Sequence, residues 1–281
     1  VVPAHSVEPY LARLIRRGYR VALCDQMETP EQAKARKAPT IRREVVRLVT
    51  PGTVTEEALL DASRPAWLLA LAPEEGRIGA AWLDISAGGF GTESVAAAEL
   101  GALLARLEPA EILVPEEFAA TPALAPYAER LAHITLPRDG ARRLCDAFEV
   151  ATLDGFGSFS DSEIAASAAA LDYVRATQAG ALPRLSPPVP AGDARVLQMD
   201  AATRRSLEIL RSERGGAKDC LLDAVDRTVT AAGARELAAR LASPLAEMQA
   251  IAARHDAVSF ALAAAAARAA LRAALKGAPD M

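Results

Sequence analysis

The chain has 281 residues, of which 51% are hydrophobic and 24% charged, and this is the composition of a soluble globular protein with room for two or three domains. The formal net charge of −4 argues against a uniformly basic nucleic-acid-binding surface. The three cysteines are far apart, odd in number and in no CxxC pair, which argues against a disulfide framework or a zinc site. The most apolar tract, residues 260–275, is interrupted by Arg268 and Arg272 and so lacks the sustained hydrophobicity of a membrane span. We therefore expect a cytoplasmic protein with no membrane partner.

The first 50 residues predict an incomplete α/β unit. Apolar residues recur at helical spacing over residues 7–15, and residues 19–23 alternate as a short strand. The segment from Thr29 to Gln32 offers an N-cap, a proline at the first helical position and a capping-box glutamine, which predicts a second helix. A strand over residues 45–49 follows. Two helices and two strands need more chain to complete a domain, so we expect a fragment of a longer protein.

A sharp turn ends this last strand. Pro51 presets φ and Gly52 tolerates φ > 0, so the pair stops the strand. Thr53 or Thr55 can then cap a helix with an acidic first turn. The chain is expected to change direction here.

Residues 66–183 predict a complete mixed α/β domain. The expected strands cover residues 67–71, 78–85, 90–94 and 112–114, and the expected helices cover residues 95–107, 138–148 and 160–179. The first two strands flank a short turn and should form an antiparallel hairpin. A proline-rich tract at residues 183–190 closes the region, and the pattern is almost wholly helical from residue 195 onward.

Four stretches, in order along the chain, carry a family resemblance. They are VPAH at Val2–His5 with VALCDQ at Val21–Gln26, VVRLVTPGT at Val45–Thr53, LDISAGGF at Leu83–Phe90, and the Asp, Thr, Thr, Gly, Arg and closing Pro-Leu pattern within Gly216–Leu245. Together they resemble the MutS family of DNA mismatch-repair proteins. The chain departs from the family pattern at Val1, Asp25, Ala87, Cys220, Ala232 and Arg240.

The resemblance implies an α/β fold with four regions. Residues 1–53 would be the C-terminal part of the mismatch-recognition, DNA-binding domain, residues 54–65 a hinge or linker, residues 66–183 a connector domain of ribonuclease-H-like topology with a mixed sheet, and residues 184–281 the all-α start of a helical core domain. It also implies DNA mismatch repair. The parent protein would bind mispaired double-stranded DNA as a homodimer, hydrolyse ATP with magnesium, and engage MutL through the connector. The family's Phe-x-Glu probe and Walker loop would lie outside this chain.

A basic cluster lies between the second predicted helix and the strand that follows it. The candidate DNA-backbone residues are Lys34, Arg36, Lys37, Arg42 and Arg43. Lys and Arg neutralise phosphate charge without reading sequence, so this stretch predicts backbone contact. The alternative interpretation is an ordinary solvated loop. Arg47 is assigned to the strand itself.

No catalytic residue, cofactor or metal site is assigned to this chain, and because no GxxxxGK[ST] sequence occurs, we do not expect the fragment to be an ATPase. Asp84 lies where a ribonuclease-H-like nuclease would keep a metal-binding carboxylate. The other candidates, Glu93, Glu111 and Asp154, have no spacing that marks them as partners. Asp84 is therefore interpreted as a strand-end residue bonded to a turn. Two alternatives to mismatch repair remain: a MutS-like recombination or scaffold protein without mismatch recognition, and a nuclease that uses Asp84.

Overall fold

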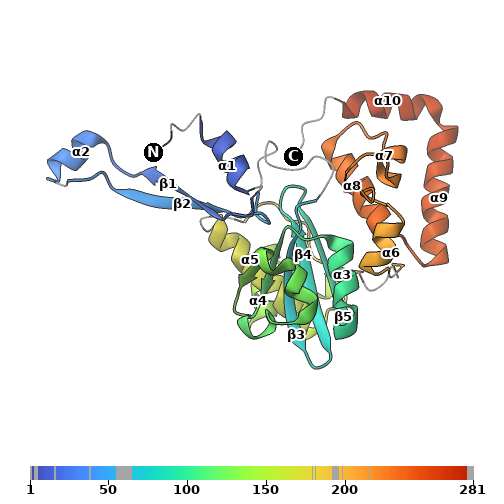
Figure 1. Cartoon of the computed structure of the whole chain (residues 1–281), viewed down its shortest axis with the longest axis horizontal. Coiled ribbons are helices and arrows are strands. Elements are labelled where there is room, and N and C mark those ends of the chain that lie inside the picture. The colour runs from blue at the N-terminus through green and yellow to red at the C-terminus, as the bar shows by residue number, and fades with distance from the viewer. Residues whose placement is uncertain are drawn as a thin grey trace.

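The structure is a computed structural model, and it describes residues 2, 6–15, 17–37, 39–54, 65–178, 180, 182–191, 196–197, 199–214 and 216–276. The helix expected after Thr53 or Thr55 lies outside these residues, apart from Val54 and Pro65 at its edges. The described part forms a two-stranded ribbon, a six-stranded sheet between helices, and a group of helices on the far side (Figure 1). The α/β class with a mixed sheet followed by helices agrees with the prediction.

The N-terminal region is a long antiparallel ribbon with a short helix at its tip. α1 (Val7–Ile15) is followed by β1 (Val21–Gln26), α2 (Pro30–Ala35) and β2 (Arg43–Val49), and β1 pairs with β2. We call residues 21–49 the arm; it leads away from the six-stranded sheet (Figure 1). The predicted capping box is present at α2, because Gln32 N donates to Thr29 Oγ1 at 3.2 Å and Thr29 N donates to Gln32 Oε1 at 2.8 Å.

β1 begins at Val21, two residues later than the sequence pattern predicts. The reason is the end of α1. Gly18 adopts φ 80°, its N–H donates to the carbonyl of Ile15 at 2.8 Å, and the N–H of Tyr19 donates to the carbonyl of Leu14 at 3.1 Å. These are the two hydrogen bonds of a Schellman helix end, so Tyr19 still belongs to the helix terminus.

The central sheet has the strand order β7-β6-β3-β4-β5-β8. Its strands are β3 (Leu68–Glu74), β4 (Arg77–Asp84), β5 (Gly89–Ala96), β6 (Glu111–Val114), β7 (Leu131–His133) and β8 (Val189–Pro190). β3, β4 and β5 are antiparallel neighbours, as the predicted hairpin requires, whereas β6, β7 and β8 join by parallel pairing. The sheet is therefore mixed.

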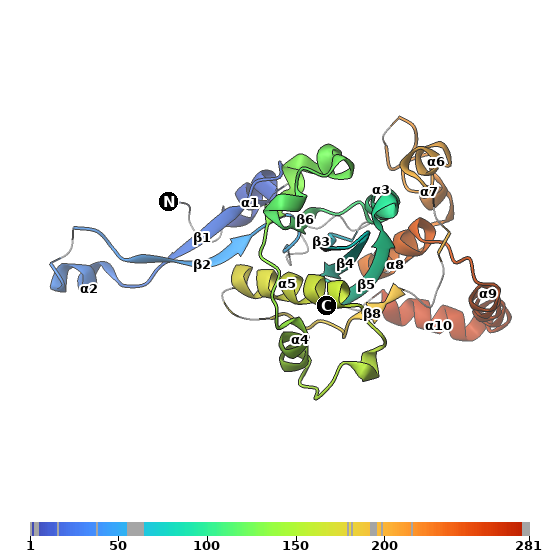
Figure 2. The same ribbon diagram turned by 90° about the horizontal axis from the view of Figure 1, so that it is seen from below.

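Helices cover both faces of this sheet (Figure 2). α4 (Gly140–Phe148) and α5 (Asp161–Thr177) pack on one face, against Leu68, Ala70, Ala81 and Leu83 among others. α3 (Leu100–Leu107) packs on the other face, against a second set of buried side chains that includes Leu69, Leu71 and Ile78. Alternate residues of β3 thus enter opposite cores, which is why the strand reads as a continuous apolar run.

Four features of this domain differ from the sequence prediction. The helix expected over residues 95–107 starts only at a 3₁₀ turn, η3 (Ala97–Glu99), because Val95 and Ala96 pair with Ile78 and Arg77 of β4. β7 was not predicted, and it follows two 3₁₀ segments, η4 (Glu116–Phe118) and η5 (Pro122–Arg130). A further 3₁₀ turn, η6 (Asp154–Phe156), precedes α5. The proline-rich tract supplies β8, the last strand of the sheet.

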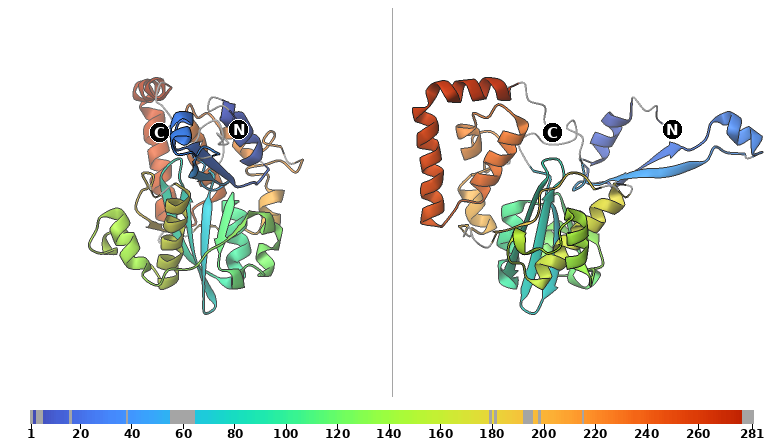
Figure 3. Two further views of the ribbon diagram at one scale, coloured as in Figure 1. Left: turned by 90° about the vertical axis from the view of Figure 1, so that its left-hand side faces the viewer. Right: turned by 180° about the vertical axis from the view of Figure 1, so that it is seen from behind.

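The remaining chain is helical. It comprises α6 (Ala201–Ser206), α7 (Leu221–Val225), α8 (Ala231–Ala242), α9 (Met248–Ala263) and α10 (Ala265–Leu275). Neither α9 nor α10 contains a buried residue, and Figure 3 shows both on the outer side of the group. Within the described residues, no single helix is long and apolar enough to cross a membrane; α9 and α10 pass that test only together, and they meet at a 95° bend.

Candidate nucleic-acid interface

The five predicted DNA-backbone residues lie in the last turn of α2, just after it and at the start of β2. Figure 1 shows α2 at the far end of the arm, which we call the tip. Lys34 is in the last turn of α2, Arg36 and Lys37 follow it, and Arg42 and Arg43 lead into β2. All five side chains are exposed. The local reason is the capped helix, which ends at Arg36 and leaves the cationic residues in the turn where the ribbon reverses.

Two of these five cations already have acidic partners. The Arg36 guanidinium donates from Nη2 to Glu28 Oε1 at 2.6 Å and from Nε to Glu28 Oε2 at 3.2 Å. The backbone N–H of Arg42 donates to the same Glu28 Oε1 at 2.6 Å, and the Arg42 side chain pairs with Glu44. The Arg36 side chain and then the Arg42 backbone hold the pKa of Glu28 below its ordinary value. Glu28 therefore stays ionised and ties the two sides of the turn together.

The other three cations differ in their acidic partners. In the part of the chain that the structure describes, no acidic side chain pairs with Lys34, Lys37 or Arg43. Glu28 precedes the basic cluster in the sequence, and its contacts with Arg36 and Arg42 were not part of the sequence prediction. Contact with phosphate is thus most direct for these three residues, since Arg36 and Arg42 would have to exchange a carboxylate for a phosphate. Arg47, as predicted, is a residue of β2, and it is half-buried.

Asp84 closes the turn between β4 and β5. Its Oδ1 accepts hydrogen bonds from Ser86 N at 3.0 Å, Ser86 Oγ at 2.6 Å and Ala87 N at 3.2 Å. This confirms the interpretation of Asp84 as a strand-end residue bonded to a turn.

The other acidic candidates are dispersed. Glu93 pairs with the buried Arg106, whose guanidinium lies 5.5 Å from the ring centroid of Trp82, and Asp154 is exposed on η6. Among the described residues, no three His, Cys, Asp or Glu side chains come close enough to hold a metal ion.

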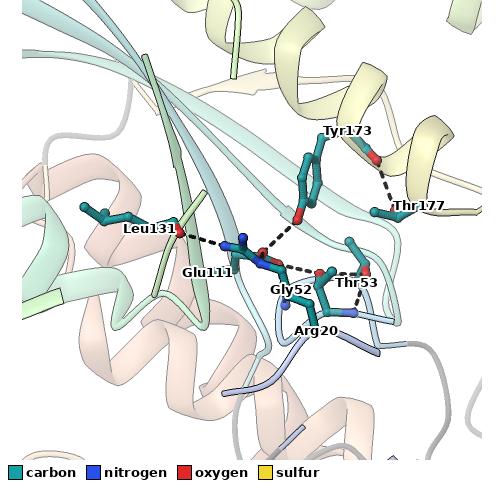
Figure 4. A network of polar contacts seen from close by, with 8 residues as sticks. Arg20, Gly52, Thr53, Glu111, Leu131, Tyr173 and Thr177 are labelled. Atoms are coloured by element: carbon teal, nitrogen blue, oxygen red, sulfur yellow. Dashed lines mark hydrogen bonds and ion pairs between the residues drawn. The ribbon is translucent and has the colours of Figure 1, made fainter. Parts of the chain in front are cut away.

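Glu111 has a structural role that sequence reasoning missed. It is the first residue of β6, its exposed fraction is 1%, and it lies at the root of the arm (Figure 4). Its Oε1 accepts from Arg20 Nε at 3.1 Å and from the Tyr173 hydroxyl at 2.7 Å. Its Oε2 accepts from the Thr50 hydroxyl and from Gly52 N at 3.2 Å. One buried carboxylate therefore joins the base of the arm to β6 and α5.

Further hydrogen bonds surround this junction. Arg20 Nη2 donates to the carbonyl of Leu131 at 2.6 Å, and Gln178 Nε2 donates to the carbonyl of Thr53 at 3.2 Å. Burial, and after it the Glu111 carboxylate, raises the pKa of Tyr173, so its hydroxyl stays protonated and remains a donor. The sequence contains no local signal for this network, because Arg20 and Thr50 are 91 and 61 residues from Glu111.

Gly52 has a different role from the one predicted. Its φ lies outside the left-handed region, so freedom at positive φ is not what the position requires. A Cβ at this position would lie 2.8 Å from Leu68 Cδ1 and 2.9 Å from Glu111 Cβ. Only a residue without a side chain lets the turn approach β3 and β6 this closely.

Comparison with known proteins relates this arrangement to one family. Three family models match in sequence order: MutS domain I over residues 1–58, MutS domain II over residues 66–186 and MutS domain III over residues 202–281. The arm belongs to the first match, strands β3 to β7 to the second and the helices from α6 onward to the third.

Individual relatives agree over the same length. The chain is 51% identical over 283 residues to the DNA mismatch repair protein MutS of Granulibacter bethesdensis, covering 100% of this chain and 30% of that protein. It is 48% identical to MutS of Rhodopseudomonas palustris strain HaA2 and 46% identical to MutS of Bradyrhizobium sp. strain ORS 278, in each case covering 100% of this chain and 32% of the relative. The chain thus spans about a third of the relatives it matches. Because three consecutive MutS domain models match and the sequence similarity to these relatives extends over the whole chain, the chain belongs to the MutS family of DNA mismatch-repair proteins.

Proposed function

We propose that this chain contributes to DNA mismatch repair by placing a cationic arm against the DNA backbone and carrying that arm on the connector sheet. The observation that supports this is the position of the five exposed basic residues at the tip of the arm, within the segment matching MutS domain I. Lys and Arg at such a site position a protein on DNA and do not read the base sequence. The chain's own contribution is therefore contact and coupling.

For the protein of which this chain covers about a third, we propose the activities that belong to the family resemblance. It binds mispaired double-stranded DNA as a homodimer, uses ATP and magnesium, and engages MutL through the connector. The relatives' names support only the mismatch-repair role. No residue of this chain is assigned to ATP or magnesium.

The two alternatives have less support. A nuclease that uses Asp84 needs that carboxylate free for a metal, whereas its Oδ1 already accepts three hydrogen bonds from the β4–β5 turn. A recombination or scaffold protein without mismatch recognition would not require the segment that matches MutS domain I. Mismatch repair accounts for both the arm and the connector.

The test is a titration of homoduplex and G·T-mismatched DNA at several salt concentrations. If Lys34, Lys37 and Arg43 alone neutralise phosphates, the slope of log K against log salt is about −2.7, and if all five residues do so it is about −4.5. Replacing Arg42 and Arg43 by Ala should flatten the slope by about 0.9 if Arg42 stays with Glu44, and by about 1.8 if DNA displaces that partner.

A matched control removes two exposed arginines far from the arm, Arg254→Ala with Arg272→Ala, on α9 and α10. It changes the net charge equally and should leave the slope unaltered. If the arm variant leaves the slope unchanged, the arm is not the DNA contact. A preference for the mismatch beyond a few-fold would show that the arm does more than position DNA.

A further inference from the structure

We propose that Glu111 is a positioning residue that sets the orientation of the arm relative to the connector sheet. The proposal concerns the geometry of the chain itself, and it is independent of whether the arm meets DNA. It assigns a mechanical role to one carboxylate that lies far from the tip and outside the basic cluster.

Both ends of the arm are bonded to Glu111. Arg20 immediately precedes β1, and Thr50 immediately follows β2. Both side chains converge on Glu111, Arg20 Nε on Oε1 at 3.1 Å and the Thr50 hydroxyl on Oε2. A two-stranded ribbon held at one strand could swing about that point, whereas one held at both strands keeps a fixed direction.

The Glu111 carboxylate has a fixed position within the sheet domain. It lies in β6 with an exposed fraction of 1%, and the Tyr173 hydroxyl of α5 donates to it at 2.7 Å. β6 pairs on both sides, with β3 and with β7. The position of Glu111 is therefore that of the rigid sheet, and Figure 4 shows Arg20 and Gly52, which flank the arm, beside it.

The apolar cluster at the root of the arm is separate from the cores of the sheet, and polar contacts connect the two. The buried apolar cluster at the root of the arm consists of Leu11, Ile15, Val49 and Val54, and none of these belongs to either core cluster of the sheet. In the described part of the chain, the side-chain hydrogen bonds that join the root to the connector include those of Glu111 and the bonds of Arg20 to Leu131 and Gln178 to Thr53. Directional polar contacts, together with the close approach of Gly52 to Leu68, therefore define the angle between the arm and the sheet.

The substitution Glu111→Gln tests this because an amide cannot replace the carboxylate. If the Gln nitrogen faces Arg20 and Tyr173, the Arg20 Nε–H loses its acceptor; if it faces Thr50 and Gly52, the Gly52 N–H loses its acceptor. The side chain has nearly the same shape in both cases, so packing is preserved while one link of the junction is lost.

The measurement uses cysteines that the chain already has. Cys24 is exposed on β1 of the arm, Cys145 is partly exposed on α4 of the connector, and Cys220 is buried and is replaced by Ala. Spin labels on Cys24 and Cys145 report the distance between arm and connector by double electron–electron resonance. We expect one narrow distance distribution for the unsubstituted arm root and a broad or shifted one for Glu111→Gln.

The matched control is Glu117→Gln, which removes an exposed carboxylate six positions further along the same domain and should leave the distribution narrow. Thr50→Val, which deletes only the hydroxyl at one strand root, should also broaden it and provides the test if Glu111→Gln does not fold. Tryptophan fluorescence confirms a folded connector in every sample, because Trp67 and Trp82 both lie there.

An unchanged distribution for Glu111→Gln or, where that variant does not fold, for Thr50→Val would overturn the proposal, as would equal broadening in Glu117→Gln. These outcomes are separate from the salt titration above. Loss of the salt-slope effect refutes the DNA contact without altering the distances, and an unaltered distance distribution refutes the positioning role without altering the slope.

Discussion

Gly79 lies in β4, where the beginning of α5 crosses the sheet. A Cβ at this position would lie 2.2 Å from the carbonyl carbon of Ser162, 2.4 Å from its oxygen and 2.5 Å from Glu163 N. These are backbone atoms, so no side chain can rotate away, and the start of α5 would have to move by about 1 Å to restore van der Waals contact. That start is fixed by a capping box between Ser160 and Glu163. We therefore expect Gly79→Ala to cost about 3 kcal/mol, the upper end of the usual range for overpacking.

The matched control is Gly101→Ala. Gly101 is exposed within α3, and a Cβ there would meet nothing within 4 Å. The same chemical change should stabilise the domain by about 0.5 kcal/mol, because alanine favours the helical conformation more than glycine does and Gly101 lies in the first turn of α3. Opposite signs for two identical substitutions isolate the close approach as the cause.

The assay is urea unfolding followed by tryptophan fluorescence. Both tryptophans of the sequence, Trp67 and Trp82, belong to the sheet domain, so the signal reports that domain. With an m value of about 2 kcal/mol per M, Gly79→Ala should lower the midpoint by roughly 1.5 M and leave m unchanged. A loss below about 1 kcal/mol, or an equal loss in Gly101→Ala, would refute the packing argument.

Asp139, the tip of the arm and the exposed face of α9 each allow a direct test. Arg143 and Arg142 lower the pKa of Asp139 from 3.8 to about 2, so the stabilisation from this carboxylate is complete above pH 3.8 and is lost as the pH falls toward about 2. The variant Asp139→Asn should therefore show a free energy of unfolding, measured in urea, that changes less with pH between these two values. Limited trypsin digestion should cut first at the exposed tip residues Lys34 and Lys37 and leave the sheet domain whole by intact-mass spectrometry, and early cuts between Trp82 and Leu113 would contradict this. Sedimentation velocity should show concentration-dependent association through the exposed Phe260 and Leu262, reduced when both are replaced by Ser; a monomer at all concentrations would count against it.

Local patterns in the sequence were sufficient for the elements whose stabilising contacts are also local. The capping box of α2 and the β3–β4 hairpin were predicted because their partners lie a few residues apart. The helix beginning at Val95 was wrongly predicted, since pairing of Val95 and Ala96 with β4 overrides their helical spacing. β8 was missed because prolines in the tract around it indicate a linker, whereas an edge strand also tolerates them.

In the candidate interface, too, the sequence predicted the local features and missed the long-range contacts. Lys34, Lys37 and Arg43 were predicted near the junction of a helix and a strand, and in the structure they lie at the end of α2, in the turn after it and at the start of β2, with their side chains exposed. The roles of Glu28 and Glu111 could not be read from the sequence. Glu28 reaches Arg42 from 14 positions away and Glu111 reaches Arg20 from 91 positions away, and no short-range spacing encodes such contacts.

The two-residue strand β8 also protects the sheet against unwanted association. Without it, the eight residues of β5 would form an open edge with free N–H and C=O groups, to which a strand of another molecule could add. Val189 and Pro190 pair with Gly91 and Thr92 at the middle of this edge, and the carbonyl of Gly88 accepts from Ser186 N at 2.7 Å. Pro190 has no N–H to offer a further strand, so sheet growth stops at β8. A shortened protein ending before Val189 should therefore aggregate more readily than one that retains Pro190.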